Sequence, residues 1–332
     1  MQTALYQKES LLAEKMTSIA DRMEGSILKV LAYFAIFQYP LTKKEIKQFL
    51  DKQLSEDVLD RTLQRLVEEK NIFRLIDFYS LQDNLLLAEK RIAGNRRAEK
   101  LLQKATRIGR FLYQFPFVSA IGISGSLSKN YADERADIDF FIVTKANRLW
   151  IARTFMHIFK KITYCTGSQH LFCMNYYIDE ANLLIEDENV FTALEIKTLL
   201  PVSGEKVMDD FFTANNWSTS LLPACSFRRQ QKKDRGRSWF KQIAEWLFNN
   251  KMGDRLDNYL VKITTRRWKK KEEKGQLNQK GQPMGLITGK HFARSNPDSF
   301  QEKILSAYHT QLSVLQSNMP QWFDAISLSF SA

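Results

Sequence analysis

One stretch of the chain, residues 119–144, constrains the fold more than any other. It reads SAIGISGSLSKNYADERADIDFFIVT. The short apolar run Ala120 to Ser124 leads into Gly125-Ser126, which predicts a buried strand that enters a Gly/Ser turn and then a helix. A second strand is predicted from Ala136 to Val143. The stretch therefore predicts two strands joined by a turn and a short connection.

Two acids interrupt the second predicted strand. Asp137 and Asp139 lie two residues apart, so their side chains would point from one face of the strand while Ile138 points from the other. Two carboxylates held side by side repel each other unless a proton or a cation neutralises one of them. Mg²⁺ binds one or two carboxylates together with phosphate oxygens and waters. The pair therefore predicts a magnesium site.

The turn before these acids predicts a phosphate site. The amide of Gly125 can approach a phosphate closely because glycine has no side chain. Ser126 adds a hydroxyl and a backbone N–H at the start of the predicted helix, where the helix dipole favours anions. Phosphate and metal binding converge on one ligand, a nucleoside triphosphate with Mg²⁺.

Together these residues resemble the signature of the DNA polymerase β-like nucleotidyltransferase superfamily. The matching elements are Gly125-Ser126, ten intervening residues, and the run Asp137-Ile138-Asp139-Phe140. The run GSLSKN is similar to the GSxARG variant of stand-alone transferases, so Lys129 stands where a phosphate-contacting arginine often lies. The resemblance covers about Val118 to Asp179, under a fifth of the chain. Ala136 departs slightly, because this superfamily often has Ser or Thr there.

The resemblance implies a reaction and its site residues. An enzyme of this kind transfers a nucleoside monophosphate from ATP or another NTP to an acceptor hydroxyl and releases pyrophosphate. Asp137 and Asp139 would hold Mg²⁺, and Gly125, Ser126 and Lys129 would bind phosphate. An exposed strand end and an ordinary Gly-Ser turn are the simpler interpretation, but it requires several coincidences of spacing.

The third predicted strand, Leu171 to Ile178, departs from the superfamily. Members commonly place a third acid on it, where the acid binds metal and helps to deprotonate the attacking hydroxyl. This chain has Asn175 there, and Asp179 follows at the strand end. Three alternatives follow: Asp179 reaches the metals, Asn175 is a neutral ligand, or no third ligand exists. The departure bears on turnover more than on nucleotide binding.

The N-terminal residues 1–84 predict an amphipathic helix followed by a winged helix-turn-helix-like domain. Thr42 and Glu45 form a capping-box pattern, Ser55 is placed to cap another helix, and a small hairpin is expected around Asp77. Between Thr42 and Arg74 there are 8 basic and 7 acidic residues. This balance is a poor footprint for duplex DNA and favours a structural or protein-docking role.

Basic residues are concentrated in two segments. Residues 228–281 contain 17 Lys or Arg and 6 Asp or Glu, and residues 86–114 contain 8 and 2, within a chain of net charge +12. The two segments therefore carry +11 and +6, and the remaining residues sum to −5. Either segment could bind RNA or a triphosphate, or could be a solvated helix surface.

The sequence thus predicts an α+β protein in which a small mixed-sheet nucleotidyltransferase core is flanked by helical regions. The expected boundaries are a basic connecting helix over 85–115, the core over 116–187, and a mostly helical, basic region over 188–332. Polar residues 269–284 are expected to form a loop. No stretch is long and apolar enough to span a membrane, the N-terminus has no signal-peptide pattern, and three unpaired cysteines favour the cytoplasm.

Two classes of function follow. The first is a Mg²⁺-dependent enzyme whose acceptor is a small molecule, RNA or a protein, with no membrane partner expected. The second is a non-catalytic nucleic-acid-binding or regulatory protein built on the same fold, which the missing third acid favours. The sequence identifies neither the acceptor nor the preferred nucleotide nor the oligomeric state.

Overall fold

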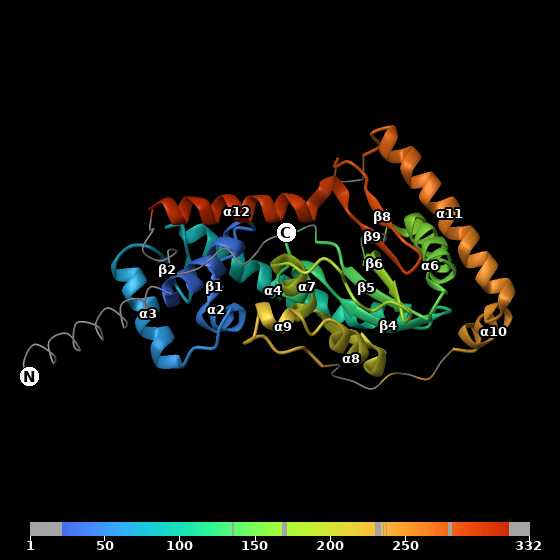
Figure 1. Cartoon of the computed structure of the whole chain (residues 1–332), viewed down its shortest axis with the longest axis horizontal. Coiled ribbons are helices and arrows are strands. Elements are labelled where there is room, and N and C mark those ends of the chain that lie inside the picture. The colour runs from blue at the N-terminus through green and yellow to red at the C-terminus, as the bar shows by residue number, and fades with distance from the viewer. Residues whose placement is uncertain are drawn as a thin grey trace, which may run out of the picture.

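The structure is a computed structural model, and it describes residues 22–134, 136–167, 171–229, 234, 236, 238–277 and 281–318. The chain has an α+β architecture with a mixed six-stranded sheet and a small antiparallel three-stranded sheet. Figure 1 shows the small sheet towards one end of the molecule and the large sheet towards the other. Helix α12 (Phe300–Asn318) lies over the N-terminal part and contributes buried side chains to its core.

An N-terminal module forms around the small sheet. Its elements are a helix over residues 22–35, β1 (Leu41–Thr42), α2 (Lys43–Phe49), α3 (Glu56–Glu68), β2 (Phe73–Leu75) and β3 (Phe78–Ser80). The predicted capping box is confirmed, because the Glu45 N–H donates to the Thr42 hydroxyl and the Thr42 N–H donates to the Glu45 carboxylate. The predicted hairpin is also confirmed, and its strand β3 pairs with both β1 and β2.

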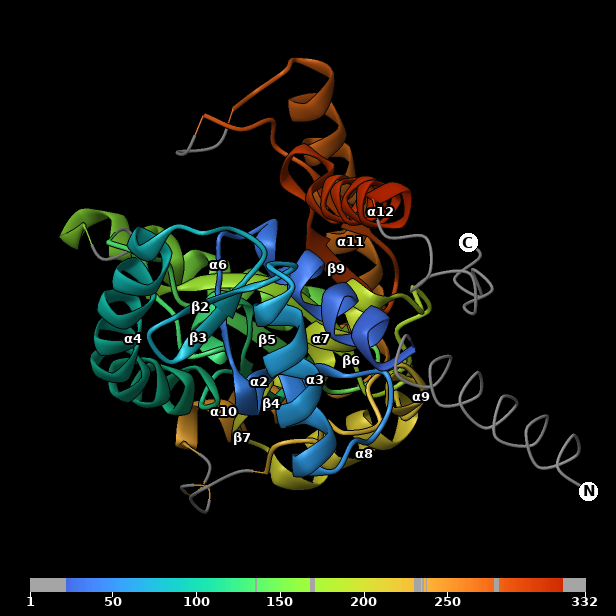
Figure 2. The same cartoon turned by 90° about the vertical axis from the view of Figure 1, so that its left-hand side faces the viewer.

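A long helix, α4 (Leu85–Leu112), connects this module to the large sheet, as the sequence predicted. Figure 2 shows α4 along one side of the molecule. Its buried stripe contains small residues that permit close packing. A Cβ on Gly94 would lie 2.3 Å from the Tyr131 ring, and one on Gly109 would lie 2.9 Å from Val202. The helix therefore packs tightly on both the loop after Gly125 and the sheet.

The large sheet has the strand order β7-β4-β5-β6-β9-β8. These strands are β4 (Val118–Ile123), β5 (Asp139–Thr144), β6 (Cys173–Asp179), β7 (Leu200–Ser203), β8 (Leu286–Thr288) and β9 (Phe292–Ser295). Strands β5 and β6 are parallel, and all other neighbours are antiparallel. Helix α6 (Leu149–Thr163) connects the parallel pair, which a tight turn cannot do.

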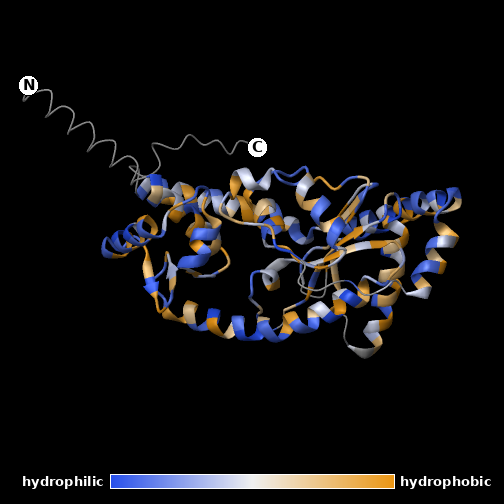
Figure 3. Cartoon of the chain, turned by 90° about the horizontal axis from the view of Figure 1, so that it is seen from below, coloured by the Kyte–Doolittle hydropathy of each residue, from blue (hydrophilic) through white to orange (hydrophobic). Residues whose placement is uncertain are grey.

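Both faces of this sheet are covered. Alternating residues of the strands pack against α4 and α6 on one face and against α7 (Val190–Thr198) and α8 (Glu205–Ala214) on the other. Figure 3 shows that the strands at the centre of the sheet are largely hydrophobic, whereas the long helices carry both kinds of residue. The remaining helices are α5 (Gly125–Ser128), α9 (Ser218–Leu221), α10 (Trp239–Phe248) and α11 (Lys251–Glu273).

Three sequence-based expectations need correction. Strand β5 begins at Asp139 rather than at Ala136, so Asp137 lies just before it. The sheet takes β7, β8 and β9 from beyond residue 187, where a mostly helical region was expected. Residues 269–273 continue α11 instead of forming a loop. Strands of three or four residues are too short to show a clear period in sequence, and pairing with β4 and β6 determines them.

Within the described residues, no helix is both long and apolar enough to cross a membrane. Most of the predicted N-terminal amphipathic helix lies outside the described residues.

Candidate active site

The glycine turn lies directly against the start of β5. The Ser124 N–H donates to the Asp139 carbonyl over 2.9 Å, which ties the end of β4 to the acid-bearing strand. Gly125 adopts a positive φ of 69°, and a Cβ there would lie 2.6 Å from Asp139 Oδ2. Only glycine satisfies both conditions. The turn and the Asp139 carboxylate are therefore in direct contact, as the sequence predicted.

The two acids lie on either side of a buried isoleucine, Ile138. Ile138 is fully buried in the core, whereas Asp137 and Asp139 on either side of it are partly exposed. Within β5 the Asp139 side chain points from the face opposite to the buried Phe140, because neighbouring side chains of a strand alternate in direction. Asp137 precedes the strand, so the pairing of its carboxylate with that of Asp139 stays a prediction.

Asn175 lies beside Asp139. Its amide nitrogen donates to Asp139 Oδ1, and the Cys173 thiol donates to its Oδ1 over 3.0 Å. The parallel register of β5 and β6 explains this proximity, because Asp139 is level with Cys173. Asn175 therefore lies beside Asp139 at this end of the β5–β6 pair.

Asp179 lies at the opposite end of the same strands, level with Thr144. Its carboxylate is fully buried and accepts hydrogen bonds from the backbone N–H groups of Asn147 (2.9 Å) and Ala181 (3.0 Å). His291 Nδ1 lies 3.0 Å from the same carboxylate. The alternative in which Asp179 reaches the metals is therefore wrong. Cys173 is the residue of β6 that is level with Asp139, and Asp179 lies six positions further along β6.

A carboxylate that the sequence did not single out fills the predicted phosphate position. Glu195, on α7, accepts a hydrogen bond from the Gly125 N–H over 3.3 Å. Its other oxygen accepts from Lys129 Nζ over 2.6 Å, and Lys129 also donates to the Gly125 carbonyl over 3.2 Å. Gly125 and Lys129 therefore form an anion-binding pair, and Glu195 is the anion that it holds. A glutamate within a helix gives no sequence signal for this role.

The helix after the turn is shorter than expected. α5 spans only four residues, so its dipole adds little, and anion binding depends on individual N–H groups and on Lys129. Ser126 is exposed at this turn. Arg228, at the start of the basic segment, donates to the Ser128 carbonyl over 2.9 Å and brings a further cation to the loop.

The N-terminal module contacts this loop directly. The Tyr39 hydroxyl donates to the Lys129 carbonyl over 2.6 Å, and the Arg91 guanidinium lies 3.6 Å from the centre of the Tyr39 ring. Arg91 also pairs with Glu45 of the capping box. Burial, followed by the nearby charge of Glu195, raises the pKa of Tyr33 well above its usual range. The module thus contacts Lys129 directly and lies near the Glu195 carboxylate.

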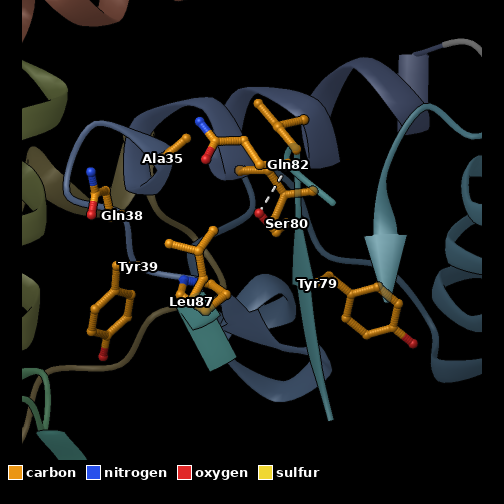
Figure 4. A pocket seen from close by; sticks show the side chains of 10 residues that line it. Ala35, Gln38, Tyr39, Tyr79, Ser80, Gln82 and Leu87 are labelled. Atoms are coloured by element: carbon orange, nitrogen blue, oxygen red, sulfur yellow. Dashed lines mark hydrogen bonds between the residues drawn. The ribbon is translucent and has the colours of Figure 1, made fainter. Parts of the chain in front are cut away.

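A small hollow in the N-terminal module shares Tyr39 with these contacts but includes neither the Gly125 turn nor Asp139. Figure 4 shows its lining of apolar and uncharged polar side chains, among them Ala35, Tyr79 and Leu87. None of the ten lining residues is charged, so the hollow offers no counterpart to phosphate or metal.

No family model matches the chain, and neither the curated proteins nor the solved structures give a significant match. The site must therefore be interpreted from its own geometry.

Proposed function

We propose that this protein is a Mg²⁺-dependent nucleotidyltransferase that moves a nucleoside monophosphate from an NTP to an acceptor hydroxyl and releases pyrophosphate. The observation that carries the proposal is the contact between the Gly125 turn and Asp139, where a Cβ would meet the carboxylate at 2.6 Å. This closeness supports a site in which one triphosphate with its magnesium ion would contact both the turn and the acids.

Asp137 and Asp139 would hold the magnesium ion. Two carboxylates suit Mg²⁺, which takes its remaining ligands from phosphate and water, and Asn175 offers a neutral amide beside them. Among the described residues no group of three or more His, Cys, Asp or Glu is placed to hold a metal alone. When bound, Mg²⁺ would neutralise charge on the reacting phosphate.

Gly125 and Lys129 would bind the β and γ phosphates. In the free protein their N–H and ammonium groups hold the Glu195 carboxylate, whose side chain is 30% exposed. A triphosphate would replace this carboxylate with a more highly charged anion, and such contacts are strong when both groups are ionised. Ser126 belongs to the same turn, and Arg228 donates to the Ser128 carbonyl, so both would be placed to assist.

The test is transfer of label from α-labelled NTPs. The protein is incubated with Mg²⁺, each NTP in turn and a cell extract, and the labelled product is separated into small-molecule, RNA and protein fractions. Asp139→Asn should abolish labelling. Asp77→Asn, in the exposed hairpin of the N-terminal module, is the matched control and should label as the wild type does. Full labelling by Asp139→Asn would contradict the metal role.

A non-catalytic regulatory role is the second candidate, and Asn175 in place of a third acid favours it. DNA recognition through the N-terminal module has less support. Lys43 and Lys47, which lie on α2, pair with Asp60 and Glu56 of α3, so these cations are already neutralised. A shift of a DNA duplex at physiological salt, with no labelling and no thermal stabilisation by Mg-ATP, would favour this candidate.

A further inference from the structure

The inward side of helix α10 carries Ala244 and Phe248, and it also carries two charged residues, Lys241 and Glu245. Lys241 is 3% exposed, and its ammonium donates to the Tyr113 carbonyl over 2.8 Å and to the Val118 carbonyl over 2.6 Å. Fully buried lysines are rare unless their donors are satisfied, as they are here. These contacts fix the rotation of α10 about its own axis.

Glu245, one helical turn further on, also fixes the orientation of α10. Its carboxylate accepts from the Phe117 N–H over 3.0 Å. Breaking such a bond would leave a buried N–H without a partner, so α10 cannot roll to hide its apolar face.

The opposite face of α10 is apolar and open to solvent. Trp239 is 74% exposed and Trp246 is 79% exposed. The same face also carries the exposed side chains of Phe240, Ile243 and Leu247. Surface helices normally show the reverse arrangement, and a contiguous exposed apolar patch marks an interaction site.

This apolar face continues onto α6. The Phe240 ring lies 6.2 Å from the Phe155 ring, and exposed Ile158 and Ile162 follow Phe155 at helical spacing. Of the 19 exposed large hydrophobic side chains among the described residues, nine lie on α6, α10 and α11. We define the apolar platform as the following residues of α10 and α6: Trp239, Phe240, Ile243, Trp246, Leu247, Phe155, Ile158 and Ile162.

Cations adjoin the apolar platform. Helix α11 packs on both α6 and α10, and it contains eight Lys or Arg and four Asp or Glu. Its exposed cations include Lys251, Arg255, Lys262, Lys269 and Lys270, and α6 ends with Lys160 and Lys161. The surface therefore combines protruding tryptophans and aliphatic side chains with a net positive charge.

We propose that the apolar platform and α11 dock the protein onto the surface of an anionic phospholipid bilayer, without spanning it. Tryptophan and aliphatic side chains on one side of a helix, with nearby lysines and arginines, are the features of an interfacial helix. The platform would enter the boundary between headgroups and acyl chains, and the cations would lie near lipid phosphates. This departs from the sequence-based expectation of no membrane partner, and it does not depend on the proposed catalytic function.

Single-stranded RNA and a protein partner fit the apolar platform less well than a bilayer does. Single-stranded RNA would stack on Trp239 and Trp246, but it gains nothing from Ile158, Ile162 and Ile243, whereas acyl chains do. A protein partner would bury a surface rich in lysine, which protein–protein interfaces disfavour. Docking through α10 would also leave the candidate site accessible, because α10 is held at the Val118 end of β4 and Gly125 follows the other end.

Co-sedimentation with vesicles tests the proposal. The full chain should bind vesicles of phosphatidylcholine containing phosphatidylglycerol, and binding should weaken with salt and on pure phosphatidylcholine. The triple variant Trp239→Ser, Ile243→Ser, Trp246→Ser should reduce partitioning by about tenfold or more. The double variant Leu85→Ser, Leu86→Ser changes exposed apolar residues elsewhere, at the start of α4, and should bind as the wild type does.

A second variant tests the charge contribution separately. Lys269→Glu with Lys270→Glu alters only exposed positions, so folding should be preserved, and it should lower binding to anionic vesicles about tenfold. Absence of vesicle binding by the wild type would overturn the proposal. So would binding of single-stranded RNA, or formation of a dimer, that the triple variant abolishes while vesicle binding is unaffected.

Discussion

An aspartate lies at each end of the β5–β6 strand pair, but the two side chains differ in their burial and in their contacts. At one end Asp139 is partly exposed and faces a glycine turn, and at the other Asp179 is fully buried with three hydrogen-bond partners. Asp179 resembles a structural carboxylate, because all its interactions are satisfied within the fold. Asp139 faces outward, where a ligand could complete its coordination.

The difference lies in what surrounds each carboxylate. The Asp179 end is closed by the loop after β5, by the loop after β6 and by His291 from the β8–β9 hairpin. The Asp139 end is bordered by Gly125, which has no side chain, and by Glu195, which is itself partly exposed. One end of the strand pair is thus closed by the fold, and the other is the end at which we propose that the ligand binds.

The largest effect expected is on transfer, at the open end. Asp139→Asn removes a charge that would hold Mg²⁺ and should lower labelling by about a thousandfold or more. The melting temperature should change little, because Asn can keep the hydrogen bonds made by Asp139. If Asp139→Asn lowered the melting temperature as well as the labelling, Asp139 would be a structural residue like Asp179, and the proposed difference between the two ends would be wrong.

The matching change at the closed end is Asp179→Ala. It removes a fully buried carboxylate and leaves the N–H groups of Asn147 and Ala181 without their acceptor, so the free energy of unfolding should fall by about 3 kcal/mol. Urea denaturation followed by circular dichroism measures this. Unchanged stability, with labelling lost, would instead place Asp179 in the chemistry.

Asp257 is a third carboxylate, and its burial makes the stability of the fold depend on pH. Asp257 is buried and accepts from the Ile151 N–H at the start of α6 over 2.9 Å. Burial raises the pKa of Asp257 from 3.8 to about 6, although hydrogen bonds from Ile151 and Trp150 oppose the shift. Because the folded pKa lies above the unfolded one, the stability contributed by protonation is full below about pH 4 and lost as pH rises through about 6.

Asp257→Asn should remove this pH dependence. Relative to the variant, the wild type should lose on the order of 2 kcal/mol of unfolding free energy between about pH 4 and about pH 7. Urea midpoints of both proteins at the two pH values provide the measurement. Parallel pH profiles would show that Asp257 titrates normally in the folded protein.

The smallest effect expected is at Glu195. Glu195→Gln removes a negative charge that competes with phosphate for Gly125 and Lys129, so pyrophosphate with Mg²⁺ should bind about tenfold more tightly. Isothermal titration calorimetry measures the affinity. Glu205→Gln, at an exposed position in the first turn of α8, is the control and should leave it unchanged. Weaker binding to Glu195→Gln would show that Glu195 assists the ligand.

Local patterns predicted much of the fold. The Thr42–Glu45 capping box, the hairpin around Asp77, the long α4 and the strand before Gly125 follow from short-range rules and are present. The three short strands contributed from beyond residue 187 were missed, because they depend on pairing partners distant in sequence. The mounting of α10 was also not predictable, since periodicity identifies an apolar face but does not say which way it points.

The sequence alone determined that Gly125 and Asp139 would be neighbours, because a strand, a turn and a returning strand bring them together within a few residues. Only the tertiary structure decided that Asn175 joins them, that Asp179 does not, and that Glu195 fills the anion position. Those outcomes depend on the register of β6 against β5 and on the packing of α7 beside the turn. Contacts between segments far apart in the chain are set by the whole core, and no local pattern encodes them.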